Sequence, residues 1–396
     1  MASTTAAPSA YPDLTRDRAS IGSRTAAIPW YIWCAALAVT SAVIGANWDI
    51  SWHMSIGRDT FWTPAHKAIY LCGVLAGVAF GYIILSTTWS KTSPLSDVSV
   101  HIWGFRAPLG AFIASWGGIM MLTSAPFDSW WHDAYGLDVK IISPPHILLF
   151  MGVYGVLLGT LVLIAGHMNR STGSTRRVSQ SLLLHGCGMM LIMLMTMLME
   201  YLDRIHLHTS LPYVVLAAFA PIMLSAARAT GLRFAATLTA GIYTVFNVGL
   251  IWILPLFPAE PKLGPVYQHV THFIPEAFPI LLIVPALALD LLWERIKGWN
   301  AWQIAILSSI VFVAVMVLAE WPFASFLMSP AARNRVFGAM YLWYGLPQNT
   351  YSAQYMFWNN ESTGEFWRGM LLAVFFGVLS FRFGLSRAEW LRNIKR

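Results

Sequence analysis

The chain has 396 residues, of which 57% are hydrophobic and only 11% are charged, and this composition excludes an ordinary soluble globular protein. Its net charge of +7 is expected for basic loops at a membrane surface, so it does not indicate a nucleic-acid partner. The composition predicts a multi-pass protein whose first partner is the lipid bilayer.

Residues 1–27 are polar and rich in Ala, Ser and Thr, and no short apolar core follows their charges. We expect a disordered cytoplasmic tail and no cleaved signal. Beyond this tail, apolar segments long enough to cross a bilayer recur, so we expect an all-α helical bundle of about ten transmembrane helices. The spans are predicted near 28–46, 67–88, 108–126, 146–166, 180–200, 211–229, 234–256, 277–293, 301–327 and 367–386.

The basic residues predict how this bundle is oriented. If both termini are cytoplasmic, 17 of the 25 Lys and Arg residues face the cytoplasm, as the positive-inside rule requires. Only 8 then lie on the outer side. We therefore expect a protein of a bacterial-type inner (cytoplasmic) membrane with its N and C termini inside.

The spans form two predicted units. Residues 28–178 hold four helices, and residues 179–396 hold six helices with long external loops at 257–276 and 328–366. The aromatic run at 351–358 in the second loop indicates a position at the membrane interface or contact with an external partner. Other membrane subunits or a second copy of the chain are further expected partners.

A pattern in the first unit occurs twice and consists of Asp-x3-His followed by a second His beyond a short loop. The two copies are Asp49, His53 and His66, and Asp128, His132 and His146. Since four residues make about one helical turn, each Asp shares a helix face with the His that follows it. Thr63-Pro64 and Ser143-Pro144 come just before the later histidines and predict the capped start of the next helix.

Each triad offers two imidazoles and one carboxylate, which is the donor set of a facial metal triad. The alternative is an Asp–His hydrogen bond that ties two helix ends together. Near-equal spacing in both copies, 4 then 13 and 4 then 14 residues, favours the metal. These ligands suit Cu, Zn or Fe and do not select among them. In the predicted orientation both triads lie at the outer face of the membrane.

A third set of acidic and His residues follows the fifth span and continues in the next outer loop. It comprises Glu200, Asp203, His206, His208, His269 and His272, with exposed loop histidines as the alternative interpretation. The fifth span is also rich in Met, which predicts either a path for soft Cu(I) or adaptable packing. The 19 Trp residues predict an aromatic belt at the two membrane surfaces; as an alternative, Trp52 and Trp131, which adjoin the triads, are expected to support the ligands.

The stretch WDISWHMSIGRDTFWTPAH resembles the most recognisable segment of one membrane subunit of particulate methane monooxygenase and ammonia monooxygenase, the copper membrane monooxygenases. Arg58 and Asp59 accompany the ligands in this segment, so we expect them to support the site. The resemblance covers about residues 28–167 and implies copper bound by the first triad. It extends to His132 and His146 as a second site, where we expect the family to carry an amide in place of Asp128.

Residues beyond about 167 have no counterpart that we recognise in that family, and the sequence has no cupredoxin-like domain of the kind that these enzymes carry on a different polypeptide. We therefore predict a copper-binding membrane protein, with zinc or iron as alternatives, that activates O2 to hydroxylate a small substrate. As an enzyme it would be part of a copper-dependent monooxygenase. Two other classes stay open: a copper or metal transport or handling protein, and a non-catalytic subunit of a larger membrane assembly with a structural metal.

Overall fold

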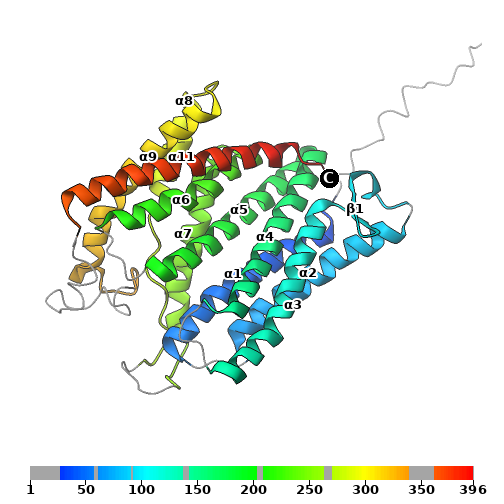
Figure 1. Cartoon of the computed structure of the whole chain (residues 1–396), viewed down its shortest axis with the longest axis horizontal. Helices are drawn as coiled ribbons and strands as arrows, with labels where there is room; N and C mark the ends of the chain where they lie inside the picture. The colour runs from blue at the N-terminus through cyan, green and yellow to red at the C-terminus, as the bar shows by residue number, and fades with distance from the viewer. Residues whose placement is uncertain are drawn as a thin grey trace, which may run out of the picture.

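The computed structural model describes residues 27–57, 61–90, 92–136, 142–202, 208–262, 270–338 and 361–395, with the backbone alone at 200–202. Nearly all of the predicted N-terminal tail lies outside these ranges. The described chain is a bundle of helices (Figure 1). The α-helices are α1 (Trp30–Ser55), α2 (Pro64–Trp89), α3 (Leu109–Tyr135), α4 (Pro144–Arg170), α5 (Gly173–Leu202), α6 (Ser210–Ala226), α7 (Ala235–Ile253), α8 (Ile283–Arg295), α9 (Ala301–Leu327) and α11 (Thr363–Asn393).

Minor elements connect these helices. A two-stranded antiparallel hairpin, β1 (Val100–Ile102) and β2 (Phe105–Ala107), lies between α2 and α3. Single 3-10 turns lie at Ser96–Val98, Ala227–Thr230, Leu254–Leu256 and Pro330–Ala332.

Nine helices in the described part of the chain are long and apolar enough to cross a membrane. This finding confirms the expected all-α, multi-pass membrane class. One of the ten predicted spans is wrong. The segment 277–293 is extended at its start and then forms the 13-residue helix α8, which is not among the nine long helices. The orientation of the bundle across the membrane stays a prediction.

The connections between the N-terminal helices lie at two opposite ends of the bundle (Figure 1). At one end, called here the triad end, α1 leads to α2 and α3 leads to α4. The hairpin and the C-terminus lie at the other end (Figure 1). There the Asn169 side chain, at the end of α4, donates hydrogen bonds to the carbonyls of Leu391 and Ile394, both at 2.8 Å.

Small residues let the four N-terminal helices approach one another closely. A Cβ added at Gly117 of α3 would lie 2.5 Å from the Gly152 carbonyl oxygen of α4, and one added at Gly45 of α1 would lie 2.7 Å from the Ile69 amide of α2. Backbone contact of this kind is typical of helix pairs in membranes. There the hydrophobic effect does not drive helices together, and small residues let them pack closely enough for van der Waals contact to do so. It fixes the α1–α2 and α3–α4 pairs and hence their loop-side ends.

The segment from Ile274 through α8 crosses the bundle, and its first part is extended rather than helical. Ile274 exchanges hydrogen bonds with the Ser51 and Ser55 hydroxyls of α1, at 2.5 and 2.7 Å, near the triad end. At the opposite end, Asp290 accepts hydrogen bonds from the amide and hydroxyl of Thr237, at 2.8 and 2.7 Å. Residues between these points therefore pass through the bundle, first extended and then as α8.

Extended backbone at membrane depth requires internal hydrogen-bond partners. Two side chains of neighbouring helices supply them: the Tyr243 hydroxyl accepts from the Ile280 amide at 3.2 Å, and the Glu320 carboxylate accepts from the Leu281 amide at 3.1 Å. Glu320 is only 2% exposed. Its position is thus explained by the unwound segment that it faces.

Replacement of Glu320 should therefore lower the stability of the fold in a way that depends on the new side chain. Glu320→Leu removes the acceptor and leaves the buried Leu281 amide unpaired, which should cost about 1–3 kcal/mol, whereas Glu320→Gln keeps an acceptor oxygen and should cost less. Thermal unfolding of the detergent-solubilised protein measures this difference. Glu389→Leu, at an exposed site, is the control, and equal effects of Leu and Gln at 320 would contradict the assignment.

Candidate functional site

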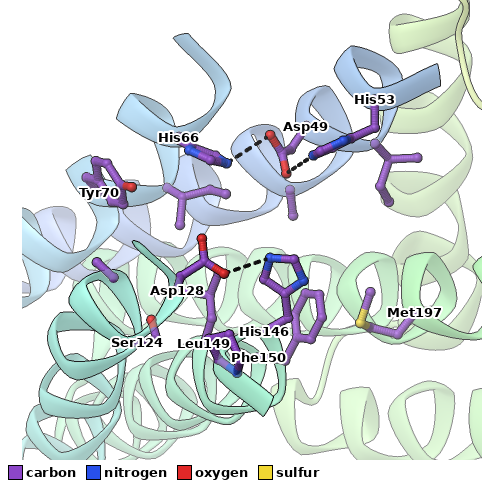
Figure 2. A pocket seen from close by; sticks show the side chains of 15 residues that line it. Asp49, His53, His66, Tyr70, Ser124, Asp128, His146, Leu149, Phe150 and Met197 are labelled. Carbon is purple, nitrogen blue, oxygen red and sulfur yellow. Dashed lines mark ion pairs between the residues drawn. The ribbon is translucent and has the colours of Figure 1, made fainter. Parts of the chain in front are cut away.

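The first triad lies where α1 ends and α2 begins. Asp49 and His53 lie one turn apart near the end of α1, and His66 lies in the first turn of α2. The Thr63 side chain accepts a hydrogen bond from the His66 amide at 3.3 Å, and Pro64 opens the helix, so the predicted cap is confirmed here. Asp49 lies between the two imidazoles, with His66 Nε2 3.3 Å from Oδ1 and His53 Nε2 3.7 Å from Oδ2 (Figure 2).

The second triad repeats this arrangement between α3 and α4. The Nε2 atoms of His132 and His146 lie 3.5 and 3.3 Å from the two carboxylate oxygens of Asp128. Helix α4 begins where predicted, with Ser143 at its N-cap and Pro144 in its first turn. The Ser143 side chain makes no capping hydrogen bond, so this part of the prediction is wrong. The two copies of the sequence pattern thus form two copies of one local structure.

Both triads face a single pocket at the triad end of the bundle. The pocket has a volume of about 70 Å³, which is enough for a few molecules of the size of water. Asp49 and Asp128 approach it from opposite walls (Figure 2). His132 is the one triad residue that does not line it. The lining residues are Ala46, Asp49, Ile50, His53, His66, Ile69, Tyr70, Ser124, Ala125, Asp128, Pro145, His146, Leu149, Phe150 and Met197.

Outside the triads the pocket walls are mostly apolar, with Tyr70 and Ser124 as the exceptions. The Asp49 and Asp128 side chains are 22% and 24% exposed, so both carboxylates are largely withdrawn from bulk solvent. Asp49 Oδ1 is fully covered and receives no hydrogen bond of normal geometry, although His66 lies close to it. A buried carboxylate oxygen of this kind is an acceptor for a cation or a strong donor.

Within the described residues, no group of three or more His, Cys, Asp or Glu side chains already has the arrangement of a metal site. His53, His66 and His146 point at a carboxylate rather than at a common empty centre (Figure 2), and His132 Nε2 likewise lies 3.5 Å from Asp128 Oδ2. The separations nevertheless suit shared ligation, because two ligands of a tetrahedral ion with bonds of about 2.0–2.1 Å lie about 3.3–3.4 Å apart. Small rotations of the side chains would open room for an ion between them.

The tautomer of His132 supports the same chemistry. Its Nδ1 lies 3.2 Å from the Gly136 carbonyl oxygen, which can only accept, so Nδ1 carries the proton. In a neutral imidazole Nε2 then presents its lone pair toward Asp128. A metal-binding histidine usually has this arrangement, with its second nitrogen donating to a backbone carbonyl or carboxylate. By donor chemistry, Asp49, His53 and His66 could hold one ion, and Asp128, His132 and His146 could hold another.

The third predicted cluster is not assembled among the residues that the structure describes. His208 is 8% exposed, and its Nε2 pairs with the Ser325 hydroxyl at 2.9 Å and the Trp321 carbonyl at 3.2 Å, so it ties the turn before α6 to α9. His272 pairs locally with the Thr271 hydroxyl at 2.8 Å. Asp203, His206 and His269 and the side chain of Glu200 lie outside the described residues.

The predicted supporting residues lie behind the pocket rather than in it. Trp52 packs against Phe273 with ring centroids 5.7 Å apart, and Trp131 packs against Tyr135 at 4.5 Å. Neither lines the pocket. Trp52 thus joins the end of α1 to the segment that carries Phe273, whereas Trp131 contacts a residue of its own helix, α3. Arg58 and Asp59 are outside the described residues.

Two features of the site were not predicted from the sequence. The first is that the triads share a pocket, which depends on how the α1–α2 pair packs against the α3–α4 pair. The second is that one methionine of the predicted fifth span, Met197 of α5, lines this pocket. The methionine-rich composition of that span was a signal for it. However, Met189, Met193 and Met195 are at most 3% exposed and belong to the packed core.

No family model, no curated protein and no solved structure matches the chain in the comparisons.

Proposed function

We propose that this protein is a copper-binding membrane protein that uses O2 to hydroxylate a small substrate. The observation that carries the proposal is the convergence of two Asp/His/His triads on one small pocket with largely apolar walls. Imidazole and carboxylate donors suit copper, and an adjacent thioether favours it further. The motif in residues 49–66, with its resemblance to the copper membrane monooxygenases, supports the same assignment.

In this proposal copper supplies redox chemistry with O2, and the chain supplies the rest. Asp49 and Asp128 would complete the two ligand sets beside the imidazoles and balance positive charge in the pocket. The side chains of Ile50, Ile69 and Leu149 exclude bulk water and leave space for a small apolar or ammonia-like molecule. The pocket volume of about 70 Å³ limits the substrate to a few heavy atoms.

Isotope transfer in a single turnover tests this function. Protein loaded with Cu(I) at both triads is mixed with ¹⁸O2 and a short alkane or ammonia; oxidation of the two Cu(I) ions to Cu(II) would supply the two electrons that convert the second oxygen atom, with two protons, to water. We expect ¹⁸O-labelled product that disappears in His66→Ala. His101→Ala, an exposed residue of the hairpin at the opposite end, should retain it. Bound copper without labelled product from any small substrate would contradict the catalytic function and favour a structural or transport role.

A further inference from the structure

Met197 is the one sulfur-containing side chain among the residues that line the pocket (Figure 2). It comes from α5, whereas every titratable lining residue of the triads comes from α1 to α4. Met189, Met193 and Met195, in the preceding turns of α5, are packed in the core. Met197 is partly exposed, and its thioether borders the space between the triads.

Two hydrogen bonds to neighbouring helices, one of them fully buried, fix this position on α5. The hydroxyl of Thr196, the preceding residue, donates to the Asn47 side chain of α1 at 3.0 Å, and Asn47 and Thr196 are 0% and 4% exposed. One turn earlier, the Tyr154 hydroxyl of α4 donates to the Met193 carbonyl at 3.1 Å. The backbone at 197 is therefore held against both α1, which carries Asp49, and α4, which carries His146.

We infer that Met197 is a thioether ligand of this pocket that makes it select Cu(I) over harder divalent ions. This inference rests on the proposed function, because it requires that the triads bind copper. Imidazole and carboxylate donors accept Zn(II) and Cu(II) as readily, whereas thioether sulfur selects the soft Cu(I) ion. The methionine side chain has three rotatable bonds, so its sulfur can adjust its position at the edge of the pocket that both triads line.

Cu(I) affinity, measured by competition with a Cu(I) chelator, tests the inference through Met197→Leu. This change conserves volume and is well tolerated in packed sites. We expect Cu(I) affinity to fall by at least about 10-fold and Zn(II) affinity to be unchanged. Removal of a residue that only hydrogen-bonds to a metal ligand already lowers metal affinity about 10–100-fold, and loss of a ligand should cost at least the lower of these values. Met195→Leu, on the same helix but fully buried in the core, is the matched control and should leave both affinities intact.

Copper-edge X-ray absorption of the selenomethionine-labelled wild-type protein gives a second readout that does not depend on how a variant folds. We expect a Cu–Se contribution in the wild type and in Met195→Leu, and its loss in Met197→Leu. Copper bound with only nitrogen and oxygen neighbours, or unchanged Cu(I) affinity in Met197→Leu, would overturn the inference and leave the proposed function standing. Wild-type protein that binds no Cu(I) would overturn both.

Discussion

Replacing both His53 and His132 by alanine should remove all tightly bound metal, whereas each single replacement should remove about one equivalent. Each alanine deletes an imidazole ligand and leaves a carboxylate with one histidine, a set that holds transition metals weakly. The loss of metal affinity at each site should exceed the roughly 10–100-fold loss found when a residue that only hydrogen-bonds to a metal ligand is mutated. Elemental analysis of protein purified without chelator measures the equivalents.

The acidic residues provide a graded version of the same experiment. Asp49→Asn and Asp128→Asn keep a coordinating oxygen, so they should retain more metal than the His→Ala variants. His101→Ala is again the control, since its side chain is exposed at the opposite end of the bundle. If the double His variant keeps its metal, the triads are only Asp–His contacts that tie helix ends together.

The triads are the part of the site that local sequence could predict. Asp-x3-His defines one face of a helix, and Thr63-Pro64 defines where the next helix starts, so the members of each triad meet without help from distant residues. Their common pocket could not be predicted, because it depends on the rotation and tilt of α1 to α5. The backbone contacts of Gly45 and Gly117 fix only the α1–α2 and α3–α4 pairs, and the placement of one pair against the other depends on long-range packing.

The nine long helices were predictable for a similar reason, since hydropathy over about twenty residues reports burial in lipid directly. The same average failed at 277–293. Pro275 and Pro279 lie just before and within that segment, and proline both removes an amide donor and disfavours helix at the residue before it. Helix α8 begins only at Ile283, with Pro285 in its first turn, where proline is tolerated. The partner that makes the extended stretch stable, Glu320, lies 39 residues from Leu281, beyond any local pattern.

Filling the pocket should separate access to the metals from binding of the metals. Ala125 lines the pocket from α3 without belonging to either triad. In Ala125→Leu the larger side chain should occupy much of the roughly 70 Å³ space, with an overpacking cost of about 1–3 kcal/mol. We expect this variant to retain copper but to lose binding of azide, followed by the change in the Cu(II) spectrum, and to lose ¹⁸O transfer from O2.

Two variants control for this effect. Leu149→Ala enlarges the same pocket from α4 and should keep azide binding while extending ¹⁸O transfer to bulkier substrates. Thr123→Leu makes a comparable enlargement on the exposed face of α3 and should change neither copper content nor azide binding. Both controls test the same expectation: a small molecule reaches a metal at either triad only through the shared pocket. Normal azide binding in copper-loaded Ala125→Leu would show that the metals are reached by another route, and the shared pocket would then lose its place in the mechanism.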